Sequence, residues 1–234
     1  MNLHKRVVAI VPAAGIGKRF GPGIIKQFMT LSGKPVLIWS LAVLESMEEI
    51  SEIIPVVTDE YMGYCADLVE EYCLSKVRRI APGGRERQDS VLNGLKLVED
   101  TESPVLVHDG VRPLIEPAHI KDAINALENS DGAVVGVPVK DTIKEAEDNI
   151  VVKTLNRSSL WAVQTPQVFR YPVLYTACLR ALEENFRATD ESGLVEHYGG
   201  TVRMVQGSYM NIKVTTPEDL HIAELFISMR GKTG

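Results

Sequence analysis

The chain has 234 residues, of which 45% are hydrophobic and 24% are charged, the composition of a globular protein with a core of its own. Its 25 basic and 31 acidic residues leave a net charge of −6, which excludes a broad basic face for nucleic acid or an anionic membrane. No apolar run approaches the roughly 18–20 residues that span a bilayer, and we expect a cytoplasmic protein. An anionic ligand would have to be held by a few cations gathered in one place.

Short apolar runs alternate with longer amphipathic segments along the chain. The short runs predict buried strands at Val7–Val11, Ile53–Val57, Val77–Ala81, Val105–His108, Ala133–Val137 and Val202–Val205. Apolar residues at helical spacing predict helices at Val36–Met47, Met62–Cys73, Asp89–Val98, Ile120–Glu128, Val173–Phe186 and Asp219–Met229. The alternation predicts one α/β domain over 1–234, with a mostly parallel, Rossmann-like sheet and helices on both faces. Ligands of such sheets bind at the carboxyl ends of the strands.

One segment interrupts the alternation. Residues 140–155 contain two β-prone runs on either side of the turn signal Glu147-Asp148-Asn149. They predict a β-hairpin arm over 139–157. Because an isolated hairpin is marginally stable, it packs either on another subunit or on its own domain, and the sequence leaves both open.

Small residues and cations follow the first predicted strand. Residues 12–20 read Pro-Ala-Ala-Gly-Ile-Gly-Lys-Arg-Phe, with Lys26-Gln27 further on. A dinucleotide fingerprint fails because Phe20 replaces its third small residue, and a P-loop fails because Arg19 stands where Ser or Thr is needed. Backbone amides in a small-residue loop can still meet phosphate. The motif favours a nucleotide phosphate site, and the alternative is a plain turn with solvated cations.

Three later segments carry polar groups to the same edge of the predicted sheet. Residues 83–91, Gly-Gly-Arg-Glu-Arg-Gln-Asp-Ser-Val, can present backbone groups to a base edge or simply begin a helix. Asp109 and Arg112 follow a buried strand, where they form either a site or a structural salt bridge. Lys213 stands in a β-prone run and needs an anionic partner. Residues 216–219 fit a helix start, so we expect them to be structural.

From Val8 to about Leu225 these motifs, in this order, resemble the sugar-nucleotidyltransferase superfamily. Within it they resemble the 2-C-methyl-D-erythritol 4-phosphate cytidylyltransferases of the non-mevalonate isoprenoid pathway. The chain departs from that family's usual pattern at Gly110-Val111, where Ala-Ala is common, and at Ile25, where Pro is common.

The resemblance implies an activity and a set of site residues. CTP would donate CMP to methylerythritol phosphate and release pyrophosphate, with Mg²⁺ bridging the triphosphate oxygens and Asp109 as a candidate ligand. The implied catalytic residues are Lys26, Lys213 and Arg19. The implied CTP-binding residues are Ala13, Ala14, Gly15, Gly17, Lys18, Gly83, Gly84, Arg85, Ser90 and Asp109. The implied acceptor-binding residues are Arg112, Thr142, Arg157, Thr165 and Thr189, with Thr142 and Arg157 reaching across a homodimer.

The acceptor phosphate is already an anion near neutral pH, so the reaction needs no general base and depends on charge neutralisation and alignment. Two other hypotheses stay open. A ribitol 5-phosphate cytidylyltransferase would carry almost the same motifs, although the Pro-Ala-Ala-Gly opening favours the methylerythritol enzymes. A non-catalytic nucleotide-binding protein is the alternative from another class. An NAD-dependent oxidoreductase is disfavoured by Phe20.

Overall fold

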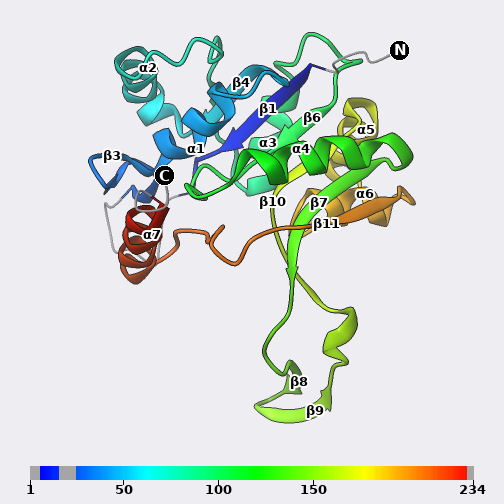
Figure 1. Cartoon of the computed structure of the whole chain (residues 1–234). Coiled ribbons are helices and arrows are strands. Elements are labelled where there is room, and N and C mark those ends of the chain that lie inside the picture. The colour runs from blue at the N-terminus through cyan, green and yellow to red at the C-terminus, as the bar shows by residue number, and fades with distance from the viewer. Residues whose placement is uncertain (1–5, 16–24, 231–234) are drawn as a thin grey trace.

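A central sheet forms the body of the protein (Figure 1). The computed structural model describes residues 6–15 and 25–230. Within these ranges seven strands lie in the order β11-β7-β10-β6-β1-β4-β5. Their bounds are β1 Val7–Pro12, β4 Ile50–Val57, β5 Ala81–Pro82, β6 Val105–Val107, β7 Gly132–Pro138, β10 Trp161–Phe169 and β11 Val202–Gln206. The pairings of β10 with β6 and β7 are antiparallel, and the other pairings in this sheet are parallel.

Helices cover both faces of the sheet, as the alternation of runs predicts. Their bounds are α1 Val36–Glu45, α2 Met62–Glu71, α3 Arg87–Leu95, α4 Pro117–Ala126, α5 Tyr171–Glu183, α6 Glu191–His197 and α7 Pro217–Arg230. In the part of the chain that the structure describes, 3₁₀ turns occupy Lys26–Phe28, Asp59–Tyr61, Leu127–Asn129 and Arg157–Ser159, and β2 Thr30–Leu31 pairs with β3 Lys34–Pro35. The predicted α/β class is therefore confirmed.

Strand β1 shows why both faces of the sheet are apolar. Its odd-numbered residues, beginning with Val7, pack in a core with α1, α2 and α4. Its even-numbered residues, Val8 and Ile10, pack in a second core with α3, α5 and α6. Successive side chains of a strand point to opposite faces, so a strand between two helical layers must be apolar throughout. Strand β1 thus lies between two helical layers, with β6 and β4 as its neighbours in the sheet.

One predicted element is wrong, and two observed elements were not predicted. The predicted strand Val77–Ala81 is mostly irregular: Val77 makes one isolated bridge to Ile53, and regular pairing begins only at Ala81. Arg79 in this run turns toward Glu52 and Glu99 to form ion pairs. The sequence also gave no indication of β10 as a sheet strand or of the seven-residue α6.

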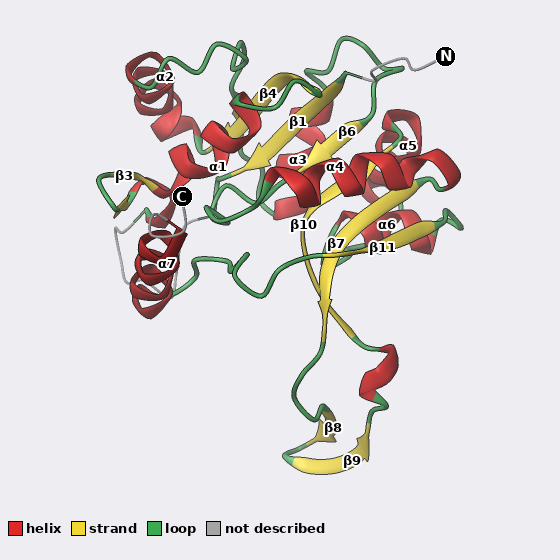
Figure 2. Cartoon of the chain, in the orientation of Figure 1, coloured by secondary structure: helices red, strands yellow, loops and turns green. Residues whose placement is uncertain are grey.

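The hairpin arm is confirmed and protrudes far from the body (Figure 2). Strands β8 Lys144–Glu147 and β9 Ile150–Thr154 pair antiparallel at its tip. The turn residues Asp148 and Asn149 both have positive φ, at 49° and 63°, as a tight two-residue hairpin turn requires. Among the described helices, none is long and apolar enough to cross a membrane.

Candidate active site

A cavity of about 560 Å³ opens at the carboxyl ends of the parallel strands. The loops after β1, β4, β5 and β6 meet there because the backbone ties them together. The Ala13 amide donates to the Val56 carbonyl at 2.7 Å, and the Gly83 amide donates to the Val57 carbonyl at 2.7 Å. The predicted ligand edge of the sheet therefore holds a cavity in the described structure.

Several sequence-predicted residues come together in this cavity. Its lining includes Ala13, Ala14, Gly15, Lys26, Gly84, Arg85, Ser90, Asp109 and Lys213 from the predicted set. Four cations and two carboxylates stand among the described lining residues, a formal charge of +2 in a chain whose net charge is −6. Gly17, Lys18 and Arg19 lie outside the described residues.

Asp109 is the centre of the charge arrangement. Its side chain is only 7% exposed, yet Arg87 lies 3.1 Å from Oδ1, and Lys213 and Arg112 lie 3.0 and 3.3 Å from Oδ2. Burial alone would raise the pKa of Asp109, but Arg87, Lys213 and Arg112 outweigh it and hold the pKa well below its ordinary value. The anionic partner that Lys213 was predicted to need is Asp109.

Residues around Asp109 fix its backbone. His108 is fully buried, and burial is the main cause that lowers its pKa to about 4. The neutral ring accepts a hydrogen bond from the Thr165 hydroxyl at Nδ1 and donates from Nε2 to the Arg112 carbonyl, at 3.0 and 3.1 Å. The same Thr165 oxygen accepts from the Asp109 amide at 3.0 Å. His108 is thus a structural residue of the site rather than a base.

The loop before α3 is held from within. The Ser90 hydroxyl accepts from the Gly84 amide at 2.9 Å and donates to the Glu86 carbonyl at 3.1 Å. The Asp89 carboxylate accepts from the Glu86 amide at 3.2 Å, which satisfies a free donor at the start of α3. A Cβ added to Gly83 would lie 2.5 Å from the Ala14 Cβ, so the two loops can approach this closely only with glycine there.

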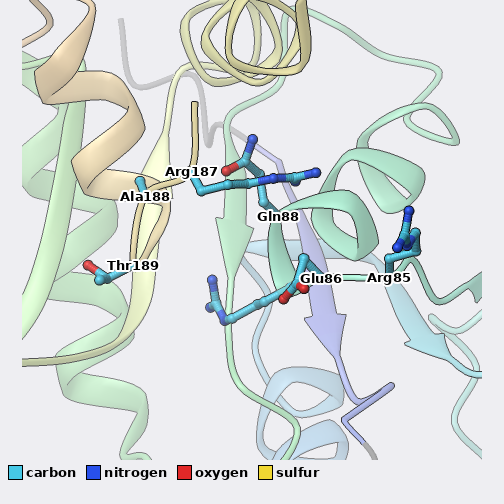
Figure 3. A pocket seen from close by; sticks show the side chains of 7 residues that line it. Arg85, Glu86, Gln88, Arg187, Ala188 and Thr189 are labelled. Carbon is cyan, nitrogen blue, oxygen red and sulfur yellow. The ribbon is translucent and has the colours of Figure 1, made fainter. Parts of the chain in front are cut away.

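The five predicted acceptor residues are all described, and none of them lines this cavity. Thr189 lines an adjoining cavity of about 550 Å³ together with Arg85, Arg87 and Arg187. Figure 3 shows Thr189 and Arg85 on opposite sides of this second cavity. Thr165 is 4% exposed, and its hydroxyl is engaged with His108 and the Asp109 amide.

Arg112, Thr142 and Arg157 lie outside both cavity linings. Arg112 is turned inward, where it donates to the Asn211 carbonyl at 2.8 Å. Thr142 and Arg157 are exposed on the arm, where Arg157 donates to the Lys140 carbonyl at 2.7 Å. The contacts predicted for these three residues with an acceptor stay predictions.

Sequence reasoning missed Arg87 and Glu191 as site residues. Arg87 stood inside the quoted run 83–91 and Glu191 stood two positions after the predicted Thr189, both without an assigned role, and they form an ion pair across 104 positions. Gln27 was also missed: it is 2% exposed, and its Nε2 donates to the Ala13 carbonyl beside the cavity. Its place directly after Lys26 was the available signal.

A family model described as "IspD: 2-C-methyl-D-erythritol 4-phosphate cytidylyltransferase" matches residues 7–229. The chain belongs to this family. A curated cytidylyltransferase of the same description from Geotalea uraniireducens is 46% identical over 225 residues, which cover 95% of this chain and 97% of that protein. One from Caldanaerobacter subterraneus is 46% identical over 223 residues, covering 94% and 98%. The resemblance to the cytidylyltransferases of the non-mevalonate pathway is confirmed.

Solved structures agree with this family. The crystal structure of a 4-diphosphocytidyl-2C-methyl-D-erythritol synthase from Anaerococcus prevotii is 31% identical with a TM-score of 0.85, covering 96% of this chain and 97% of that one. The bifunctional IspDF from Campylobacter jejuni is 25% identical with a TM-score of 0.78, and the match covers 93% of this chain and 54% of that one. The cytidylyltransferase fold therefore spans almost the whole chain.

Proposed function

We propose that this chain transfers CMP from CTP to 2-C-methyl-D-erythritol 4-phosphate, with Mg²⁺, and releases pyrophosphate. Family membership supports the reaction, and one observation supports its location: three cations converge on Asp109 in a cavity at the strand ends. An oxygen of the acceptor phosphate attacks the α-phosphorus of CTP. A P–O bond forms there, and the bond from that phosphorus to the β-phosphate oxygen breaks.

The cations of the cavity carry the chemistry in this proposal. Lys26 and Lys213 line the cavity and would stabilise the negative charge that builds up on the α-phosphate oxygens. Lys18 and Arg19 would stabilise the departing pyrophosphate. Fixed cations in a partly enclosed site stabilise a charged transition state without reorganising. The nucleotide would lie against Ala13, Ala14, Gly15 and Gly17, with its base at Gly83, Gly84, Arg85 and Ser90.

The donor set of the cavity fits Mg²⁺ that arrives with the nucleotide. Asp109 is one carboxylate at the site, and both of its oxygens contact cations. Mg²⁺ is typically held by one or two carboxylates together with substrate phosphates, so Asp109 would supply one ligand through Oδ2, where its longest contact, 3.3 Å to Arg112, would give way. When bound, the ion would neutralise charge on the phosphate oxygens. Chelation of Mg²⁺ should abolish turnover.

The arm would dimerise the protein. Ile150, Val151 and Val152 on β9 are 72%, 56% and 53% exposed, and a row of exposed apolar residues on a protruding hairpin favours burial against a partner. Lys140 lies 3.4 Å from the centre of the Tyr209 ring, which steadies the base of the arm. In this proposal residues 1–234 form one domain, and the arm brings Thr142 and Arg157 to the acceptor phosphate of the partner.

Deleting Glu147–Asn149 tests the arm. We expect a smaller particle by light scattering and a raised KM for the acceptor. An intact dimer with full activity would contradict the proposed arm.

A pyrophosphate-release assay tests the reaction. Four nucleoside triphosphates are crossed with methylerythritol phosphate, ribitol 5-phosphate and other polyol phosphates, with and without Mg²⁺. Pyrophosphate release that occurs only with the pair CTP and methylerythritol phosphate, and only with Mg²⁺, supports the proposal. A preference for ribitol 5-phosphate would show that this is the acceptor instead. CTP binding without pyrophosphate release would show that the protein binds nucleotide but does not catalyse the transfer. We place this activity in the cytoplasm.

A further inference from the structure

Arg87 occupies a position between the two cavities and lines both. Its Nε and Nη2 lie 3.3 and 3.1 Å from Oδ1 of Asp109. Its Nη1 donates to both carboxylate oxygens of Glu191. Burial alone would lower the pKa of Arg87, but Glu191 and Asp109 raise it, so the guanidinium stays charged. Because both carboxylates occupy its donors, Arg87 is built to hold protein groups rather than substrate.

Glu191 is a rigid anchor for Arg87. It is 1% exposed and is the first residue of α6. Asp190 caps this helix by accepting from the Gly193 amide at 3.0 Å, and it also accepts from the Gln167 side chain at 2.8 Å. Gln167 lies in the centre of the sheet on β10 and in turn accepts from the Ser192 amide at 3.1 Å. Glu191 is thus fixed to the sheet independently of α3, which carries Arg87, and of the loop that carries Asp109.

The other oxygen of Asp109 faces the cavity cation. Oδ2 lies 3.0 Å from the Lys213 amine, whereas Oδ1 is held by Arg87. Arg112 also contacts Oδ2, at 3.3 Å, so the carboxylate is held at both oxygens, and its orientation sets where the Lys213 amine lies. The chain of contacts Glu191–Arg87–Asp109–Lys213 therefore runs from the sheet into the cavity.

We propose that Arg87, anchored by Glu191, is a positioning residue for the transfer reaction, which sets the place of the Lys213 amine by fixing the Asp109 carboxylate. This rests on the proposed function. The same contact links Arg87, the first residue of α3 after the loop proposed to hold the base, to Glu191 at the start of α6. Without the anchor, Asp109 is held only at Oδ2, by Arg112 and Lys213, so its carboxylate can turn about that side and Lys213 loses its fixed position, while the residues proposed to contact CTP are unchanged.

The test compares four variants in the pyrophosphate assay: Arg87→Met, Arg87→Lys, Glu191→Gln, and the double variant Arg87→Met/Glu191→Gln. Because a misplacement of about 1 Å can cost about 10²-fold in rate, we expect kcat of Arg87→Met to fall by about 10²-fold with KM for CTP near the wild-type value. Arg87→Lys keeps the charge and should restore part of kcat. The double variant should be no slower than Arg87→Met, because Glu191 acts through Arg87.

Arg79→Met is the matched control. The Arg79 side chain is 28% exposed, like that of Arg87, and it also bridges two carboxylates, those of Glu52 and Glu99. It lies outside both cavity linings, so its loss should lower the melting temperature and leave kcat unchanged. All variants are assayed well below their melting temperatures, and the isosteric Glu191→Gln carries the test if Arg87→Met fails to fold.

The possible results distinguish failure of the positioning role from failure of the proposed transfer reaction. Wild-type kcat in Glu191→Gln, a change confined to KM, or independent losses that multiply in the double variant would each overturn the positioning role while the reaction stands. A wild-type protein without turnover on any polyol phosphate would overturn the proposed function and this inference with it. An active wild type with the expected kcat losses supports both.

Discussion

Replacing Asp109 with Asn removes a negative charge at the point where three cations meet. The nearest of these contacts spans 3.0 Å, at which a pair of unit charges attracts by about 5–6 kcal/mol at an effective dielectric constant near 20. Desolvation offsets much of this attraction, and breaking a buried ion pair by removing one partner costs about 3–5 kcal/mol. Lys213 is 37% exposed and Glu191 still neutralises Arg87. We therefore expect Asp109→Asn to lower the free energy of unfolding by an amount at the lower end of this range, about 3 kcal/mol.

The stability lost in Asp109→Asn should depend on pH in one direction. The cations hold the pKa of Asp109 in the folded protein below its ordinary value, which is about 3.9 in an unfolded chain. The stabilisation is thus fully present above about pH 4–5 and is lost as the pH falls through the folded-state pKa. Wild type and variant should differ by a constant amount near neutrality and converge in acid.

Thermal unfolding at pH 7 and in mild acid measures this effect. A loss of 3 kcal/mol should lower the melting temperature of a chain of this size by about 6–12 °C. Pyrophosphate should stabilise the variant more than the wild type, because it meets cations that have lost their carboxylate. Asp122→Asn, an exposed carboxylate of α4, is the control. A melting temperature within about 2 °C of wild type at pH 7 would refute the account of Asp109 as the charge centre.

Three more substitutions separate chemistry from folding. Lys213→Ala should lower turnover by about 10²–10³-fold. Because its ion pair is partly exposed, the free energy of unfolding should change by no more than about 1 kcal/mol. Normal turnover in the pyrophosphate assay would rule out its role. Gly84→Ala places a Cβ 2.3 Å from the Asp89 Cβ and should cost about 1–3 kcal/mol and weaken CTP binding by calorimetry, whereas Gly63→Ala, with nothing within 4 Å, should cost nothing. Asp190→Ala removes the cap of α6 and should cost about 1 kcal/mol in urea unfolding; an unchanged midpoint would contradict the cap.

The sequence sufficed for the elements whose pattern is local. The strand β1 and the helices α1, α2, α3, α4, α5 and α7 lie where apolar runs and helical periodicity predict them. Strand β10 was not predicted, and its Pro166 is a residue that argues against a central strand. Its ladder with β7 is interrupted between Val163 and Gln167, so the proline falls where no regular pairing is needed. Helix α6, with seven residues, is too short for periodicity to show.

The site residues also fall into two groups: those recognisable from local motifs, and those whose contacts depend on the fold. The Pro-Ala-Ala-Gly and Gly-Gly-Arg motifs are recognisable from consecutive residues, and all of their residues except Gly83 line the cavity. The ion pair of Arg87 with Glu191 joins residues 104 positions apart, and nothing local in either segment specifies the other. Arg112 and Lys213 could be identified as cations, but their shared carboxylate became apparent only with the fold.

The interruption in β10 has a consequence for how the protein opens. Trp161–Val163 pairs with β7 alone and continues from the arm, whereas Gln167–Phe169 pairs with both β6 and β7 in the core. Amides of the outer half should exchange with solvent through local opening, and those of the inner half only when the sheet unfolds. Thr165 lies at the junction and binds the Asp109 amide. Local opening of the outer half would therefore end next to the residue that holds the Asp109 amide, while the core stays closed.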